Sequence, residues 1–305
     1  MTKRNELVRS IKANYSLLLM LLPGVLYFII FHYVPLAGSV LAFKNYNIMK
    51  GVWGSEWVGL AHFRYAFSTP GFITALWNTV YISLLKLATS FPIPIVFALF
   101  LNEIPGSKFK KAIQTVSYLP YFIGWVILAS IFISVFSLDG SMNAFLVMLG
   151  LPKVPWLTEG VPFVAMLLIT NLWKTFGWNA IIYLAALSGI NPEFYEAAVI
   201  DGATRWQRVK YITFPSLSFV IVIMLILNTA NILNAGFEQI FNLYNPSVTE
   251  SAEIIDTYVY KQGIERFEYS YSTAVGLFKS LVSTGMVLLT NYLAKALGGG
   301  EYSLF

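Results

Sequence analysis

A row of amide side chains lies near the end of the apolar stretch 216–237 of this sequence. Its members are three residues apart, and a carboxylate follows four residues later: Asn228, Asn231, Asn234 and Glu238. At about 100° per residue, these side chains share one face of a helix. Amides donate and accept hydrogen bonds, so the row suits recognition of a hydroxyl-rich solute such as a sugar. The alternative is that the amides bind neighbouring helices.

Two further apolar stretches carry polar residues at helical spacing. These rows consist of Thr79, Ser83, Lys86 and Ser90 in one stretch and of Asn171, Lys174 and Trp178 in the other. Because a polar side chain facing lipid is costly, such rows normally face a neighbouring helix or an aqueous path. The indole ring of Trp178 offers an apolar surface to the C–H face of a sugar. Three rows together favour a polar path through the protein.

Three lysines are the charges nearest to the middle of their apolar stretches: Lys86, Lys174 and Lys279. These stretches contain no Asp or Glu that could neutralise them. A cation at this depth predicts a functional role, and a positive cavity suits an anionic substrate, such as an oligosaccharide that contains uronic acid. The alternatives are snorkelling of the lysine stems toward water and pairing with groups on another subunit.

The residue types needed for catalysis are scarce. The sequence has two histidines, His32 and His62, no cysteine, and neither an H-E-x-x-H nor a G-x-S-x-G motif. It also lacks the G-x-x-x-x-G-K-[ST] loop that cradles nucleotide phosphates. We therefore expect that the chain is not an enzyme and binds no cofactor or metal itself. Since the apolar stretches lack carboxylates, coupling to a proton or sodium gradient is also disfavoured.

The composition indicates a bilayer as the solvent of this chain. Of its 305 residues, 57% are hydrophobic and only 11% are charged, which is too apolar for a soluble protein. A helix needs roughly 20 apolar residues to cross about 30 Å of hydrocarbon. Six stretches meet this requirement, at 15–43, 72–101, 116–136, 162–187, 216–237 and 273–297. They show no alternation of period two, so the predicted fold class is an all-α membrane protein with six transmembrane helices.

The distribution of charge predicts the orientation of these spans. Basic residues cluster before the first span, after the second and after the fourth: Lys3, Arg4, Arg9 and Lys12, then Lys108, Lys110 and Lys111, then Arg205, Arg208 and Lys210. Positive loops stay in the cytoplasm. The acidic segment 237–272 then lies outside, and both termini are cytoplasmic. The first apolar stretch is too long for a signal peptide, so we expect it to be retained as a span.

We expect one integral membrane domain over residues 1–305, because the sequence shows no repeat and no long linker. The segment 45–71 is rich in Trp and Gly. It either folds over the outer face or forms a solvated connector.

The segment 190–215 has the features of a helix in the cytoplasmic loop after the fourth span. Asn191 can cap it, and Pro192 follows at the first helical position, where the missing N–H costs nothing. Pro215 should stop its continuation. Small and bulky apolar residues alternate with charges along the segment, so the helix either docks against a partner or lies in the membrane interface.

The same segment resembles the EAA motif of ABC importer permeases. The family pattern is E-A-A, three residues, Gly, nine residues and I-x-L-P. This sequence has Glu196-Ala197-Ala198, then Gly202, then Ile212-Thr213-Phe214-Pro215, and departs only at Phe214, where Leu is usual. Further similarity covers most of the chain, in the segments 42–46, 118–120, 177–178, 182–187 and 256–260. These segments resemble the carbohydrate-uptake, maltose-type branch, particularly permeases for polysaccharide fragments that work with a lipoprotein-like solute-binding protein.

The resemblance implies a maltose-importer-type permease fold in the bacterial cytoplasmic membrane. The implied partners are a second permease that forms a heterodimer with this chain, two ATPase subunits that bind ATP and Mg, an extracytoplasmic solute-binding protein and an oligosaccharide. It also implies that 190–215 is a coupling loop seated in a cleft of the ATPase, through Glu196, Ala197, Ala198, Asp201, Gly202 and Arg205. Gly202 also permits a bend after the first helical segment.

Two functions from different classes follow from the sequence. The first is an importer permease that moves an oligosaccharide by alternating access, with the substrate path formed by Asn228, Asn231, Asn234, Glu238, Lys86, Ser83, Asn171, Lys174 and Trp178. The second is a secondary carrier or channel for a small polar solute. A carrier would respond to an ion gradient alone, whereas the importer requires ATP.

Overall fold

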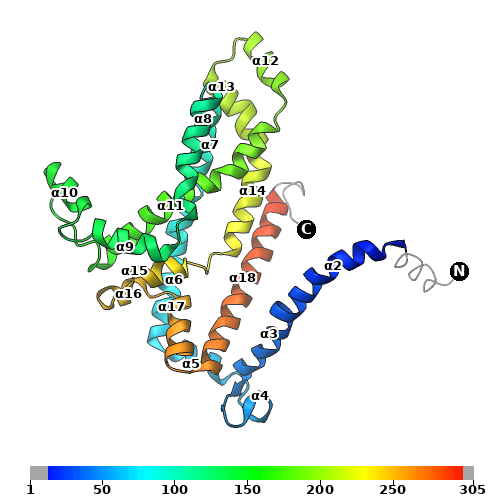
Figure 1. Cartoon of the computed structure of the whole chain (residues 1–305), viewed down its shortest axis with the longest axis vertical. Coiled ribbons are helices and arrows are strands. Elements are labelled where there is room, and N and C mark those ends of the chain that lie inside the picture. Colours follow the sequence, from blue (N-terminus) through cyan, green and yellow to red (C-terminus); the bar gives the residue numbers. More distant parts are fainter. Residues whose placement is uncertain (1–12, 298–305) are drawn as a thin grey trace. The chain divides into compact units, whose positions relative to one another are not determined.

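The computed structural model describes residues 13–297, which are predominantly helical and fall into two compact units (Figure 1). Unit 1 consists of residues 13–66 and 262–277, and unit 2 of residues 67–261 and 278–297. The basic residues expected to hold the N-terminus in the cytoplasm, Lys3, Arg4, Arg9 and Lys12, lie outside the described residues.

Unit 1 begins with the expected apolar helix and continues into a small hairpin. The run Tyr15–Phe43 comprises α2 (Tyr15–Phe28), the π-helical turn η1 (Ile29–Tyr33), α3 (Val34–Leu36) and the 3₁₀ helix η2 (Ala37–Phe43). None of the residues of α2, η1 or α3 is buried. Strands β1 (Lys44–Asn45) and β2 (Glu56–Trp57) then pair antiparallel around α4 (Gly51–Gly54).

The 45–71 segment has hydrogen bonds of its own in this hairpin. The ammonium of Lys44 donates to the carbonyls of Val52 and Trp53 at 2.9 and 3.1 Å. Ser270 Oγ accepts from the Tyr46 N–H at 3.0 Å, so residues far apart in sequence join in unit 1. The hairpin is also a small departure from the expected purely helical chain.

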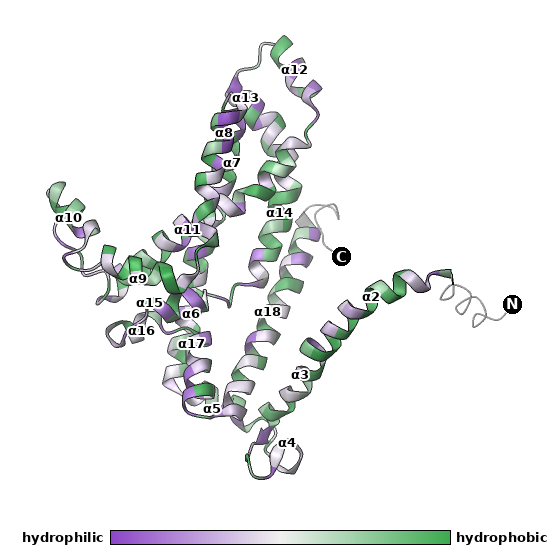
Figure 2. Cartoon of the chain, viewed as in Figure 1, coloured by the Kyte–Doolittle hydropathy of each residue, from purple (hydrophilic) through white to green (hydrophobic). Residues whose placement is uncertain are grey.

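The remaining elements belong wholly or mainly to unit 2, except Ala61–Ser68 and Lys261–Glu265, which lie mainly in unit 1. In order they are α5 (Ala61–Ser68), α6 (Pro70–Ser90), α7 (Pro92–Glu103), α8 (Ser107–Tyr118), η3 (Leu119–Phe122), α9 (Trp125–Val135), α10 (Ser141–Met148), α11 (Gly160–Ser188), α12 (Pro192–Ile200), α13 (Arg205–Arg208), η4 (Val209–Thr213), α14 (Phe214–Ala230), α15 (Phe237–Leu243), η5 (Pro246–Val248), α16 (Thr249–Ala252), α17 (Ile255–Tyr260), η6 (Lys261–Glu265) and α18 (Tyr269–Leu297). Helix α14 consists mostly of hydrophobic residues, whereas hydrophilic residues gather at α8, α12 and α13 (Figure 2).

Four helices among the described residues are long and apolar enough to cross a membrane: Tyr15–Phe43, Pro70–Glu103, Arg205–Thr229 and Tyr269–Ala296. A bent pair, Ser107–Phe122 with Trp125–Val135, makes five if it counts as one span. The predicted fourth span coincides with α11, a helix of 29 residues that is not among these candidates.

The third predicted span is not one straight helix, which corrects the expectation for 116–136. Its two halves meet at a bend of 99° around Ile123 and Gly124. Pro120 lacks an N–H for a helical hydrogen bond, and Ile123 and Gly124 both have extended backbone angles. The helix therefore ends at Phe122 and a new one starts at Trp125.

Pro215 does not end the helix before the fifth span, contrary to the expectation. Helices α13, η4 and α14 run on as one helical segment from Arg205 to beyond Pro215. A π-helical turn, Val209–Thr213, precedes the proline. A wider turn accommodates a missing N–H and the proline ring locally, as happens in membrane helices.

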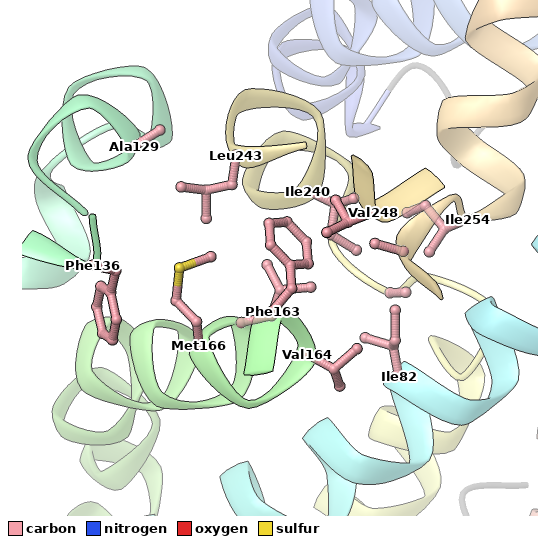
Figure 3. Packing of buried hydrophobic residues seen from close by; sticks show 13 residues of the cluster. Ile82, Ala129, Phe136, Phe163, Val164, Met166, Ile240, Leu243, Val248 and Ile254 are labelled. Atoms are coloured by element: carbon pink, nitrogen blue, oxygen red, sulfur yellow. The ribbon is translucent and has the colours of Figure 1, made fainter. Parts of the chain in front are cut away.

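Two apolar clusters hold unit 2 together. Phe163 and Met166 of α11 point toward Ile240 and Leu243 of α15, and Ile82 of α6 lies beside Val164 (Figure 3). The second cluster joins α7, α11 and α14 through Ile95, Ala98, Ala180, Tyr183, Leu187 and Leu217. Helix α11 contributes to both clusters and is the central helix of the unit.

Helix α8 approaches α11 closely at Gly177. A Cβ atom added at Gly177 would collide with the backbone carbonyl of Ser117. The absent side chain is therefore what allows the two backbones to touch.

We expect Gly177→Ala to lower the thermal stability of the detergent-solubilised subunit, because α8 and α11 must separate to admit the methyl group. Overpacking of this kind costs about 1–3 kcal/mol. The matched control is Gly285→Ala on α18, where an added Cβ meets nothing within 4 Å. Equal melting temperatures for the two variants would contradict the close approach at Gly177.

Candidate functional site

A polar cavity of about 230 Å³ lies in unit 2 between α6, α11 and the end of α14. Its walls are formed by Ser83, Lys86, Leu87, Ser90, Phe91, Asn171, Thr175, Asn179, Asn228, Asn231, Ile232, Asn234, Ala235 and Gly236. Five of these residues are asparagines and one is a lysine, and no carboxylate lines the cavity. The wall therefore offers many neutral hydrogen-bonding groups and one positive charge.

The cavity gathers most of the residues expected to form a substrate path. It brings together Ser83, Lys86, Asn171, Asn228, Asn231 and Asn234, whereas Lys174, Trp178 and Glu238 are not part of its wall. Sequence reasoning missed Thr175 and Asn179. The available signal was their spacing, since they follow Asn171 at four and eight residues on α11 and so share its face.

The sequence predicted that Asn228, Asn231 and Asn234 share one helical face. In the structure they do not. The helix ends at Ala230, so Asn231 and Asn234 belong to the turn that follows it. Gly236, with φ of +96°, then redirects the chain into α15. Asn231 and Asn234 still reach the cavity, whereas Glu238 lies on α15 and is exposed.

Helix α6 supplies the opposite wall. Asn171 Nδ2 of α11 donates to Ser90 Oγ at 3.0 Å, which ties α11 to α6. Ser83 lies two turns earlier and is only 6% exposed, yet its buried hydroxyl has no hydrogen-bond partner among the described residues. Buried hydroxyls normally have a partner, so this one marks a place where a ligand or water is expected.

Lys86 lies at the boundary between α6 and the chain that leaves α14. Its ammonium donates to the Ala235 carbonyl at 2.7 Å and to Gln239 Oε1. Gln239 is 1% exposed, and its Nε2 donates to Leu167 O and Thr170 Oγ1, each at 2.8 Å. Sequence reasoning missed Gln239, because no pattern distinguishes it from the neighbouring exposed Glu238.

Lys174 and Trp178 hold the bend between η3 and α9. The Lys174 ammonium donates to the carbonyls of Tyr121, at 2.8 Å, and Ile123, and it lies 5.5 Å from the ring centres of Tyr121 and Trp125. The ring of Trp178 stacks on Tyr121 with centroids 4.4 Å apart. These contacts give Lys174 a structural environment away from the cavity.

The expectation that Lys279 lacks an acidic partner is wrong, because Lys279 forms an ion pair with Asp256 of α17. Lys261 is paired as well, with Glu253 at 2.8 Å and with the Tyr244 hydroxyl. Burial lowers the pKa of Lys261, but the hydrogen bonds to Glu253 and Tyr244 outweigh burial and raise the pKa above its usual value. The sequence analysis placed Asp256 in an outer loop. In the structure Asp256 lies on the short helix α17 and contacts Lys279 of α18.

The EAA-like segment folds much as its residues indicate. Asn191 Oδ1 accepts from the Glu193 N–H at 3.0 Å and caps α12, and Gly202, with φ of +79°, forms the bend after it. The candidate coupling residues Glu196, Ala197, Asp201, Gly202 and Arg205 are exposed, and Ala198 is partly exposed. Tyr195 OH lies 3.0 Å from Thr213 Oγ1 and links α12 to the start of the fifth span.

The cavity offers side chains that can bind a solute through hydrogen bonds. Within residues 13–297, no group of three or more His, Cys, Asp or Glu could hold a metal ion. The amides, hydroxyls and single lysine of the cavity can bind a polyhydroxylated solute, and the lysine can bind an acidic group.

The chain is similar to transport proteins along nearly its whole length. It is 43% identical over 97% of its residues to the polygalacturonan/rhamnogalacturonan transport system permease protein YteP of Bacillus subtilis, of which the match covers 92%. It is 29% identical over 91% of its residues to the arabinooligosaccharides transport system permease protein AraP of the same species, covering 86% of that protein.

A solved structure shows the same fold. The permease chain from the crystal structure of a bacterial ABC transporter involved in the import of the acidic polysaccharide alginate matches 94% of this chain and 98% of its own length, with a TM-score of 0.87 and 39% identity. The similar chain from that transporter in complex with an alginate pentasaccharide-bound periplasmic protein has the same TM-score, with 38% identity and coverage of 95% and 97%.

Residues 90–299 match the model of the family described as binding-protein-dependent transport system inner membrane component. That range contains the cavity residues Asn171 and Asn228 and the whole EAA-like segment. Several apolar helices and this match make the chain a multi-pass protein of the cell membrane. The chain therefore belongs to the family of inner membrane components of binding-protein-dependent transport systems.

Proposed function

We propose that this chain is the permease subunit of an ATP-driven importer that carries an acidic oligosaccharide from a solute-binding protein into the cytoplasm. The observation that carries the proposal is the cavity lined by amides, hydroxyls and Lys86 with no carboxylate in its wall. Amides suit sugar hydroxyls, and the unneutralised ammonium suits a uronate. The relatives named for polygalacturonan and for alginate support an acidic substrate.

The proposed topology has six spans within one integral domain over 1–305, with both termini in the cytoplasm. Helix α11 is the fourth span and the bent pair around Gly124 the third. Within unit 2, the basic α8 and α13 lie at the end that also holds α12, and α15, α16 and α17 lie toward the other (Figure 1). This separation supports a cytoplasmic 190–215 segment and an outer 237–261 segment.

We further propose that Glu196, Ala197, Ala198, Asp201, Gly202 and Arg205 attach the chain to an ATPase subunit. The exposure of this segment and its tether from Tyr195 to Thr213 support the assignment. Two ATPase subunits carry ATP and Mg, and their closure rocks the permease as a rigid body.

A second permease is proposed to complete the path as the other half of a heterodimer. The cavity of about 230 Å³ is smaller than the roughly 300–1,000 Å³ of typical ligand sites. A half-site on each permease would reach the size that an oligosaccharide needs.

Transport assays in proteoliposomes test the function itself. The complex with its partner permease, ATPase and solute-binding protein should take up an oligogalacturonate only when ATP and the binding protein are present. Uptake that follows an imposed ion gradient without ATP would support the secondary carrier and contradict the importer.

We expect Glu196→Lys to leave the subunit inserted but to reduce ATP-driven uptake about tenfold or more, because the reversed charge repels a basic ATPase surface. The measurements are uptake per ATP hydrolysed and the amount of ATPase that co-purifies. Glu193→Lys, one turn earlier on the same exposed helix, is the matched control. Normal uptake and normal ATP hydrolysis in the Glu196 variant would show that α12 does not couple the two subunits.

We expect Asn231→Leu and Asn234→Leu to reduce uptake several-fold while the complex still assembles, because leucine removes hydrogen-bonding groups from the cavity. Initial uptake rates and complex yield are compared. Asn242→Leu is the control, since Asn242 is a partly exposed amide on α15 outside the cavity wall. Loss of assembly without a specific loss of uptake would indicate that the amides only join helices.

A further inference from the structure

Among the described residues of unit 2, four lysines are at least partly buried and donate side-chain hydrogen bonds, and they divide into two classes by the charge of their partners. Lys261 and Lys279 each form an ion pair, with Glu253 and Asp256. Lys86 and Lys174 donate only to neutral groups among the described residues. The chain thus pairs its lysines in the 253–279 region with carboxylates and leaves Lys86 and Lys174 without an acidic hydrogen-bond partner among the described residues.

These two deeper lysines differ in what they can reach. The ammonium of Lys174 is enclosed by three backbone carbonyls and two aromatic rings. Lys86 has two acceptors, Ala235 O and Gln239 Oε1, and it lines the polar cavity. An ammonium has three N–H donors, so one donor of Lys86 remains for a ligand.

Gln239 is held in one orientation by its other contacts. Its Nε2 donates to Leu167 O and Thr170 Oγ1, so its Oε1 must face Lys86. A glutamate here would place a second carboxylate oxygen against the Leu167 carbonyl, where a donor is needed. The position therefore suits an amide, which fixes the ammonium without neutralising it.

Ser83 provides an independent sign of a missing partner. It precedes Lys86 by three residues on α6, so the two side chains lie on the same helical face. Both residues line the cavity, and Ser83 Oγ is buried with no hydrogen-bond partner among the described residues. A carboxylate in the cavity could accept from the hydroxyl with one oxygen and from the ammonium with the other.

We propose that Lys86 and Ser83 form the subsite that selects the carboxylate of a sugar acid, and that Gln239 is the positioning residue that holds Lys86 at the cavity without adding a negative charge. The proposal rests on the proposed transport of an acidic oligosaccharide and assigns its selectivity to one place in the chain. Lys174 has no part in it.

The test uses the complete transport complex in proteoliposomes and two probes of equal length. One probe is a galacturonate trisaccharide, and the other is the same trisaccharide with its carboxyl groups methyl-esterified. Lys86→Met should raise the KM for the acid roughly 10- to 100-fold, as expected for a lost charge-assisted hydrogen bond, and change that for the ester less than about threefold. Gln239→Glu should show the same selective loss, because its carboxylate neutralises Lys86.

Two controls separate selectivity from folding. Gln239→Leu adds no charge but removes the acceptor that positions Lys86. Uptake of both probes should therefore fall together. The double variant Lys279→Met/Asp256→Asn removes a pair that is already neutral, and its ratio of acid to ester uptake should equal that of the wild type. Complex yield and ATP hydrolysis stimulated by the binding protein are measured for every variant.

The outcomes distinguish the two proposals. If Lys86→Met keeps the wild-type ratio of acid to ester uptake in an assembled complex, the subsite is wrong even though the importer function stands. If the wild-type complex transports neither probe with ATP and binding protein, the proposed substrate class fails. If the complex with Gln239→Glu does not assemble, the ratio of acid to ester uptake by the Lys86→Met variant alone decides whether the subsite is correct.

Discussion

A helix that ends within the protein leaves backbone carbonyls without N–H donors, and in unit 2 lysine side chains satisfy such carbonyls at two interruptions. Where such carbonyls are buried away from water, the protein must supply the donors. At the bend between η3 and α9, Lys174 donates to the carbonyls of Tyr121 and Ile123. After α14, Lys86 donates to the carbonyl of Ala235. Each interruption is thus held by a lysine from a neighbouring helix.

This arrangement explains why two chemically identical residues have different surroundings. Around Lys174, the stacked rings of Tyr121 and Trp178 and the close packing at Gly177 cover the bend. Around Lys86, the chain turns away at Gly236, where a side chain would press on the ammonium, since an added Cβ would lie 2.9 Å from Nζ. The first interruption is therefore covered by side chains, whereas the second borders a cavity.

Sequence patterns predicted the helices of this chain better than their interruptions. Runs of apolar residues located the first, second and last spans within a few residues, and Asn191 and Gly202 marked the cap and the bend of α12. Apolar residues continue past Ile123, and the asparagines on either side of the second break keep helical spacing, so neither pattern indicated a break. Pro120 was a signal of the first break, but Pro215 lies within a continuous helical segment. The presence of a proline therefore does not by itself predict where a helix ends.

The sequence predicted many residues of the candidate site, but it did not predict which residues contact its lysines. Ser83, Lys86, Asn171 and Asn228 could be found because they repeat on helical faces, and they do line one cavity. Gln239 and Asp256 lie on the short helices α15 and α17. No periodicity of the sequence therefore relates them to the lysines that they contact.

The helical segment from Arg205 to Thr229 gives the molecule a direct connection between its two functional regions. Its 25 residues extend on the order of 37 Å at 1.5 Å per residue. It begins beside α12, to which Thr213 is joined through Tyr195, and Asn228 near its far end lines the cavity. The chain leaving this helix also carries Ala235, which binds Lys86. If α12 is displaced by the ATPase proposed as its partner, the amide wall should move relative to Lys86, because a continuous helix passes on motion that a flexible loop would absorb.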